Sequence, residues 1–138
     1  MIEQVTHEGQ VLAIIVRHDY AKPGISFFTP DDYSQQLAFM SHPKGKVIQP
    51  HVHNAVKREV LYTKEVLVLR KGRLRVDFYT EERDYVSSST LEGGDVILLA
   101  LGGHGFEVLE DVEMFEIEQG PYAGEGDKTR FESAGRRG

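Results

Sequence analysis

Short strand-like segments recur along the whole chain, and glycine, proline or aspartate residues stand between them. The segments are alternating or continuous runs of apolar residues, and no stretch sustains a helical period of 3.6 residues. The expected strands cover residues 11–17, 37–41, 47–53, 65–71, 74–79, 85–91, 95–99, 104–109 and 113–118. About nine closely spaced strands predict an all-β chain that folds as a sandwich, jelly roll or barrel.

The length of the chain limits the number of domains. With 138 residues and 40% hydrophobic content, the chain can build one core but hardly two. We therefore expect a single domain over residues 1–138, with its core between about residues 10 and 120. The polar segment 132–138 is expected to be disordered.

A tight hairpin turn is predicted at Lys71 and Gly72, because glycine adopts a positive φ without a steric clash. The strand after this turn should have one apolar face and one polar face, since successive side chains point to opposite sides. The apolar face carries Leu74, Val76 and Phe78, and the polar face carries Arg73, Arg75, Asp77 and Tyr79.

Charge and composition exclude several classes of function. Lys and Arg number 16 against 22 for Asp and Glu, and a net charge of -6 argues against a nucleic-acid partner. The absence of cysteine excludes disulfides, thiolate metal ligands and thiol nucleophiles. The N-terminal residues do not resemble a signal peptide, and the longest apolar runs are too short to span a bilayer. The cytoplasm is therefore the expected location, with no membrane partner.

Three histidines and one glutamate predict a metal site. His51 and His53 are two residues apart, so both point to the same side if this segment is extended. Glu65 begins an otherwise apolar face, where an unpaired carboxylate would be costly, and His104 begins a similar apolar row. Imidazole and carboxylate ligands suit one divalent transition metal such as Fe, Mn, Ni, Zn or Co.

The spacing of these residues resembles the first motif of the cupin superfamily. Gly45 and five further residues precede the pair His51 and His53, and Glu65 and six further residues precede Gly72. The stretch 94–104, which begins Gly-Asp and ends at His104, resembles the second cupin motif.

The resemblance is to small single-domain, RmlC-like cupins, and residues 119–124 and 127–128 resemble an uncharacterised bacterial subgroup of them. It implies a double-stranded β-helix, or jelly-roll barrel, in which His51, His53, Glu65 and His104 hold the metal.

Two departures from the cupin pattern affect the ligand assignment. Eleven residues separate His53 from Glu65, more than is usual, so Glu59 is a nearer carboxylate that competes for the same role. Ala100 stands where the second motif usually has proline, and the spacing to His104 is one residue shorter.

The expected function is that of a metal-dependent enzyme acting on a small polar metabolite, such as a sugar or a carboxylic acid. Further candidates for the catalytic site are Tyr62, Tyr79 and Glu59, and those for substrate binding are Arg58, Arg75 and Phe106.

Two alternative functions come from other classes. One is a non-catalytic binding or sensory cupin that holds a small molecule without turnover. The other is a metal-free isomerase or epimerase, in which His51 or His53 is the general base and Tyr62 or Tyr79 is the acid. In each case a homodimer is expected, because the edge strands of a jelly roll need to be covered.

Overall fold

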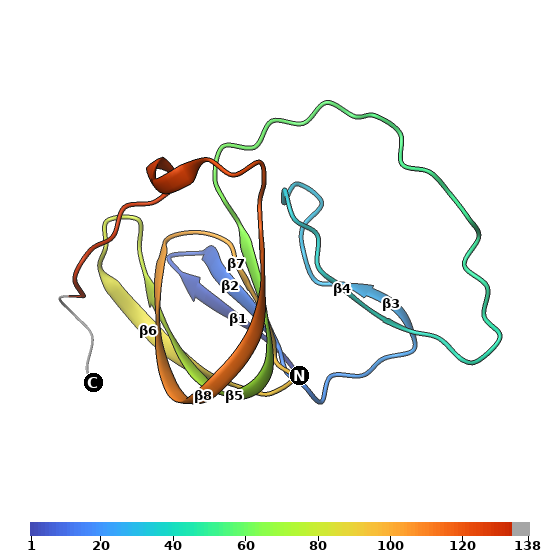
Figure 1. The fold of residues 1–138 in the computed structure, drawn as a ribbon, viewed down its shortest axis with the longest axis horizontal. Coiled ribbons are helices and arrows are strands. Elements are labelled where there is room, and N and C mark those ends of the chain that lie inside the picture. The colour runs from blue at the N-terminus through green and yellow to red at the C-terminus, as the bar shows by residue number, and fades with distance from the viewer. Residues whose placement is uncertain (134–138) are drawn as a thin grey trace.

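A strongly curled antiparallel sheet forms most of the protein in the computed structural model, which describes residues 1–133 (Figure 1). The strands run in the order β1-β2-β7-β5-β6, with β8 on β5. Their bounds are β1 (Ile2–His7), β2 (Gln10–Val16), β5 (Glu65–Tyr79), β6 (Tyr85–Glu92), β7 (Val96–Leu99) and β8 (Gly103–Glu118). The curl makes the sheet a half-barrel, which bears out the prediction of an all-β, barrel-like fold.

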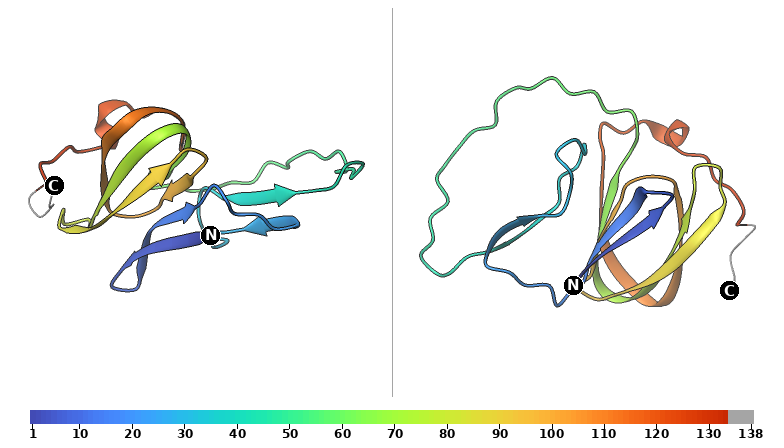
Figure 2. Two further views of the ribbon diagram at one scale, coloured as in Figure 1. Left: turned by 90° about the horizontal axis from the view of Figure 1, so that it is seen from below. Right: turned by 180° about the vertical axis from the view of Figure 1, so that it is seen from behind.

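A smaller unit projects from the half-barrel (Figures 1 and 2). It contains a two-stranded sheet of β3 (Gly24–Phe27) and β4 (Ala38–Ser41), followed by residues 42–64, which we call the arm. The arm contains no strand or helix, and it arcs away from the half-barrel before the chain returns to β5. The 3₁₀ helix η1 (Gly124–Asp127) is the one helical element in the described residues, so none of their helices is long and apolar enough to cross a membrane.

Strand β5 is the centre of the sheet. On one edge its first residues pair with β7 and its later residues pair with β6, while β8 pairs along the whole of the other edge. Within the described part of the chain, the second edge of β8 pairs with no strand. Strand β8 is therefore a long edge strand.

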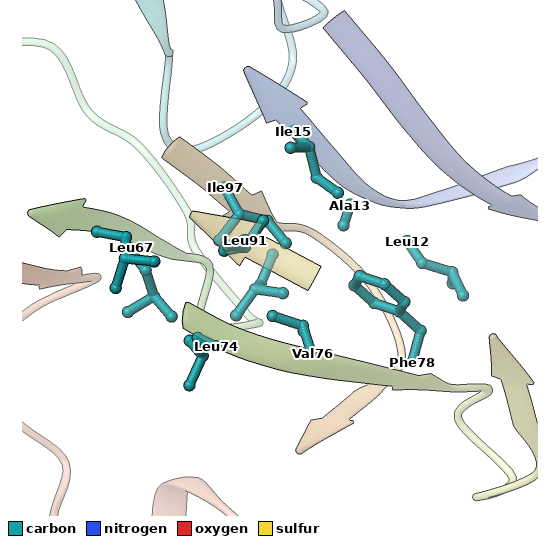
Figure 3. Packing of buried hydrophobic residues seen from close by; sticks show 11 residues of the cluster. Leu12, Ala13, Ile15, Leu67, Leu74, Val76, Phe78, Leu91 and Ile97 are labelled. Carbon is teal, nitrogen blue, oxygen red and sulfur yellow. The ribbon is translucent and has the colours of Figure 1, made fainter. Parts of the chain in front are cut away.

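Buried side chains form two hydrophobic clusters on opposite faces of the sheet. Along β2, Ala13 and Ile15 belong to one cluster and Ile14 to the other, as expected for alternating side chains. The larger cluster joins Leu67, Leu69, Leu74, Val76, Phe78, Leu91 and Ile97 across β5, β6 and β7 (Figure 3). Phe28, Tyr33 and Leu37 of the projecting unit pack against the second cluster. Hydrophobic burial is thus what holds the sheet and the base of this unit together.

Several details differ from the sequence prediction. The prediction of a hairpin turn at Lys71 and Gly72 is wrong, because strand β5 continues through both residues. The pairing of β5 with β8 shifts register on either side of them. The two segments expected at 104–109 and 113–118 likewise form the single strand β8, and β1 and β3 were not predicted. The strand expected at 47–53 is wrong, since these residues lie in the arm without a pairing partner.

The polar face predicted for residues 73–79 is partly wrong. Asp77 and Tyr79 are 2% and 4% exposed, so this face is buried at its far end. Ser88 donates a hydrogen bond to Asp77 and Arg75 lies 3.4 Å from it, while Tyr79 packs edge-on against Tyr85. The prediction of a disordered tail covers residues 132–138, and residues 134–138 lie outside the described residues.

Asp95 ties the turn before β7 to β2. It is 1% exposed, and its carboxylate accepts hydrogen bonds from the backbone N–H groups of His18 (2.8 Å) and Glu92 (2.7 Å). Arg17 Nη1 donates a further bond of 3.0 Å, and Arg17 also pairs with Glu3 on β1. Burial acts to raise the pKa of Asp95, but these hydrogen bonds outweigh it and hold the pKa below its ordinary value.

Gly72 is predicted to be intolerant of any side chain. Its φ is +96°, and a Cβ atom there would overlap the backbone carbonyl of Asp111. Gly72→Ala should lower the free energy of unfolding by about 3 kcal/mol, through backbone strain plus the overlap. Gly9→Ala is the matched control, because Gly9 also has a positive φ but open space around it, and it should cost about 1 kcal/mol. Urea unfolding measures both; equal losses would contradict the close approach at Gly72.

Asp95→Asn is predicted to destabilise the protein in a pH-dependent manner. It leaves Arg17 without a buried charged partner, so the free energy of unfolding should fall by about 3 kcal/mol at pH 7. Because the pKa of Asp95 is lowered in the folded state, its contribution is complete above about pH 4 and is lost as the pH falls further. Urea unfolding between pH 7 and pH 3 should therefore show the variant and the native protein converging. Asp84→Asn, at an exposed position, should change stability little; a constant gap for Asp95→Asn would disprove the ionic contribution.

Candidate metal centre

Glu65 and His104 meet inside the curl of the sheet. The Nε2 atom of His104 lies 3.6 Å from Oε1 of Glu65, and their side chains are 27% and 14% exposed. His104 pairs in register with Phe78, thirteen residues beyond Glu65 on β5, a distance of about 43 Å along a straight strand. The two side chains can meet only because β5 and β8 coil together, with register shifts between Leu69 and Leu74. The structure thus brings two of the four predicted ligands into contact.

Two further glutamates lie beside Glu65. In the β5–β8 ladder Glu118 pairs with Glu65 and Glu116 pairs with Leu67, so all three carboxylates share one face. One oxygen from each of Glu65, Glu116 and Glu118 lies within 4.8 Å of the others. Sequence reasoning missed Glu116 and Glu118. Their two-residue spacing indicates that both side chains lie on the same face of a strand, but only the pairing register places them beside Glu65.

Within residues 1–133, the negative charge of this cluster is offset by no lysine or arginine, because none of the three glutamates forms an ion pair with such a residue. The His104 side chain lowers the pKa of Glu65 by hydrogen bonding, against the opposing effect of burial. Burial, and then the charges of Glu65 and Glu118, raise the pKa of Glu116. One imidazole and three crowded carboxylates are suitable ligands for a divalent cation. A bound cation would reduce the repulsion between the carboxylates.

His51 and His53 lie apart from this cluster, on the arm. Both are exposed, their rings are 5.2 Å apart, and the ring nitrogen Nδ1 of His51 lies 3.0 Å from the carbonyl oxygen of Gln49. The arm arcs away from the half-barrel (Figures 1 and 2), so the structure does not bring these histidines to Glu65 and His104. Glu59, the competing carboxylate, is also exposed on the arm, whereas Glu65 is the one beside His104.

The candidate substrate and catalytic residues fall into different surroundings. The ring of Phe106 is 41% exposed and lies 5.5 Å from that of His104, so it forms part of the wall beside the cluster. Arg75 is engaged by Glu107 at 2.9 Å and by Asp77. Tyr79 is buried in the core, while Tyr62 is exposed on the arm. Arg58 lines an open hollow between the arm and residues 31–36.

Comparison of the chain with models of protein families, with curated proteins and with solved structures finds no match.

Glu116 is predicted to destabilise the metal-free protein. Because its pKa is raised in the folded state, its ionised form is disfavoured there, and Glu116→Gln should raise the free energy of unfolding at pH 8. We expect a gain of about 0.5 kcal/mol, since solvent screens this exposed side chain. The gain should vanish as the pH falls below about 4, where the carboxyl group is protonated in both states. Thermal unfolding in chelator measures this, with the exposed Glu82→Gln as control; a loss of stability at pH 8 would refute the repulsion.

Proposed function

We propose that this protein is a metal-binding, cupin-like protein that holds one divalent cation inside its curled sheet. The observation that carries the proposal is the contact between His104 and Glu65, with Glu116 and Glu118 beside it and, among residues 1–133, no lysine or arginine paired with them. A bound cation would stabilise this cluster, in which Glu65 is half-buried and Glu116 and Glu118 are exposed. The all-β, half-barrel fold and the resemblance of residues 45–104 to the two cupin motifs support the same assignment.

The proposed ligands are His51, His53, Glu65 and His104. Glu65 and His104 are already adjacent, whereas His51 and His53 lie on the arm, so the ligand set is complete only when an arm comes to lie against Glu65 and His104. Such a rearrangement would break little side-chain packing, because residues 43–62 are exposed throughout. Nitrogen and oxygen donors suit Fe, Mn, Ni, Zn or Co.

We further propose that the protein is a metal-dependent enzyme acting on a small polar metabolite. A bound divalent cation would supply Lewis-acid chemistry to an oxygen atom of the substrate. The chain itself would provide an apolar wall at Phe106 and hydrogen-bond acceptors at Glu116 and Glu118. Because these carboxylates repel anions and accept hydrogen bonds from hydroxyl groups, they favour a sugar or another polyol over a carboxylic acid.

Metal analysis of the full-length protein tests the first proposal. We expect about one divalent ion per chain after reconstitution with Mn or Zn and removal of the excess. The double variants Glu65→Gln/His104→Ala and His51→Ala/His53→Ala should each weaken binding more than about 100-fold, beyond the usual effect of losing a supporting residue. His7→Ala, on β1 at the periphery, is the matched control and should bind as the native protein does. Undiminished binding by Glu65→Gln/His104→Ala would overturn the assignment.

Turnover separates an enzyme from a binding protein. The reconstituted protein is screened against sugars, sugar phosphates and hydroxy acids, with the Glu65→Gln/His104→Ala variant as the inactive reference. Turnover that this variant abolishes supports the enzyme. Saturable ligand binding without turnover would favour the sensory or binding alternative, and turnover unaffected by a chelator would favour the metal-free isomerase.

A further inference from the structure

The arm exposes apolar side chains that the fold leaves uncovered. Val47, Val52 and Leu61 are 78%, 85% and 78% exposed, and no residue between 43 and 62 is buried. Among the described residues, the hydrogen bonds that tie the arm to the rest of the protein are at its end, from Thr63 to Asp127 and from Gln119 to Lys64. A segment of this length, extended and without secondary structure, is uncommon in a compact domain unless it binds something.

Strand β8 offers a complementary uncovered surface. One of its edges pairs with no described strand along sixteen residues, which leaves backbone N–H and C=O groups free to pair. It also exposes Val108, Phe115 and Ile117 by 55%, 58% and 52%. A long edge strand that exposes apolar side chains is a site for the addition of a strand.

The charges of the two surfaces match. The arm carries five basic residues and one acidic residue, namely Lys44, Lys46, Lys57, Arg58 and Lys64, with Glu59. Strand β8 carries no lysine or arginine and six acidic residues, namely Glu107, Glu110, Asp111, Glu113, Glu116 and Glu118. Glu107, Glu110 and Glu113 already pair with arginines of β5, so the arm would meet mainly the charges of Asp111, Glu116 and Glu118. Opposite charges of this density favour the association of the arm with β8 and disfavour the pairing of two β8 edges.

We propose that two copies of the chain exchange their arms, each arm adding to the free edge of the other copy's β8. The arm projects outward in the single chain (Figure 2), and no described strand pairs with the second edge of its own β8, which suits a partner better than its own half-barrel. Both ends of the arm belong to the same chain, so its 23 residues, which span about 75 Å when extended, reach at most about 37 Å from their attachment points, enough to contact β8 of a second subunit. Reciprocal exchange makes a closed two-fold dimer.

The exchange would make the metal centre a composite of two subunits. This part rests on the proposed function: Glu65 and His104 come from one chain, and His51 and His53 come from the arm of the other. Neither chain then holds a complete ligand set by itself. The dimer, and not the monomer, is the metal-binding species.

Complementation between two inactive variants tests the composite site. The His51→Ala/His53→Ala chain and the Glu65→Gln/His104→Ala chain are unfolded together at equal concentration and refolded. If arms are exchanged, a mixed dimer has one complete site, so about one Mn ion should bind tightly per four chains, although neither variant binds tightly alone. If each arm closes on its own half-barrel, the mixture restores no tight binding, and this result overturns the exchange when the native protein binds Mn.

Oligomeric state tests the exchange independently of metal. We expect light scattering to give the mass of two chains in chelator, and Lys57→Glu/Arg58→Glu to raise the dissociation constant of the dimer at least about tenfold. Lys22→Glu, an exposed change of the same kind outside the arm, is the control and should leave the dimer intact. A native monomer at high concentration, or a dimer insensitive to the arm charges, overturns the exchange. If the native protein forms a dimer that depends on the arm charges but binds no metal, the proposed metal centre is overturned and the arm exchange stands.

Discussion

The continuous pairing of β5 with β8 is the interaction on which the rest of the structure depends. The ladder extends from Glu65 opposite Glu118 to Tyr79 opposite Gly103, and β6 and β7 are both held by the other edge of β5. Register shifts near Gly72 bend this pair of strands, because each extra residue increases the local twist. The bend turns a sheet into a half-barrel, encloses the main hydrophobic cluster, and places His104 beside Glu65.

The same ladder creates an electrostatic conflict that bears on function. It sets Glu116 and Glu118 beside Glu65, where their charges repel and lysine and arginine partners are lacking among residues 1–133. By contrast, the buried carboxylate of Asp95 is fully satisfied by backbone N–H groups and by Arg17. The contrast separates a carboxylate that stabilises the fold from carboxylates that are costly unless a ligand binds to them.

Two of the four predicted metal ligands, Glu65 and His104, lie in contact, and the other two, His51 and His53, lie on the arm. A segment such as residues 47–53 has the composition of a strand, but a strand forms only when its backbone groups find a partner edge. The free edge of β8 has the length, exposed apolar side chains and opposite charge that such a segment requires. In the exchange that we propose, the arm and the edge of β8 that no described strand covers would satisfy each other's requirement for strand pairing.

The sequence by itself determined the β class, most strand positions, the inward face at Leu74, Val76 and Phe78, and which residue types can bind a metal, because these follow from local alternation and side-chain chemistry. Tertiary structure decided what depends on register and bending. It fused the segments around Gly72 into one strand, buried Asp77, chose Glu65 over Glu59 as the neighbour of His104, and added Glu116 and Glu118. None of these could be read from local patterns, since each is set by which residue of a distant strand lies opposite.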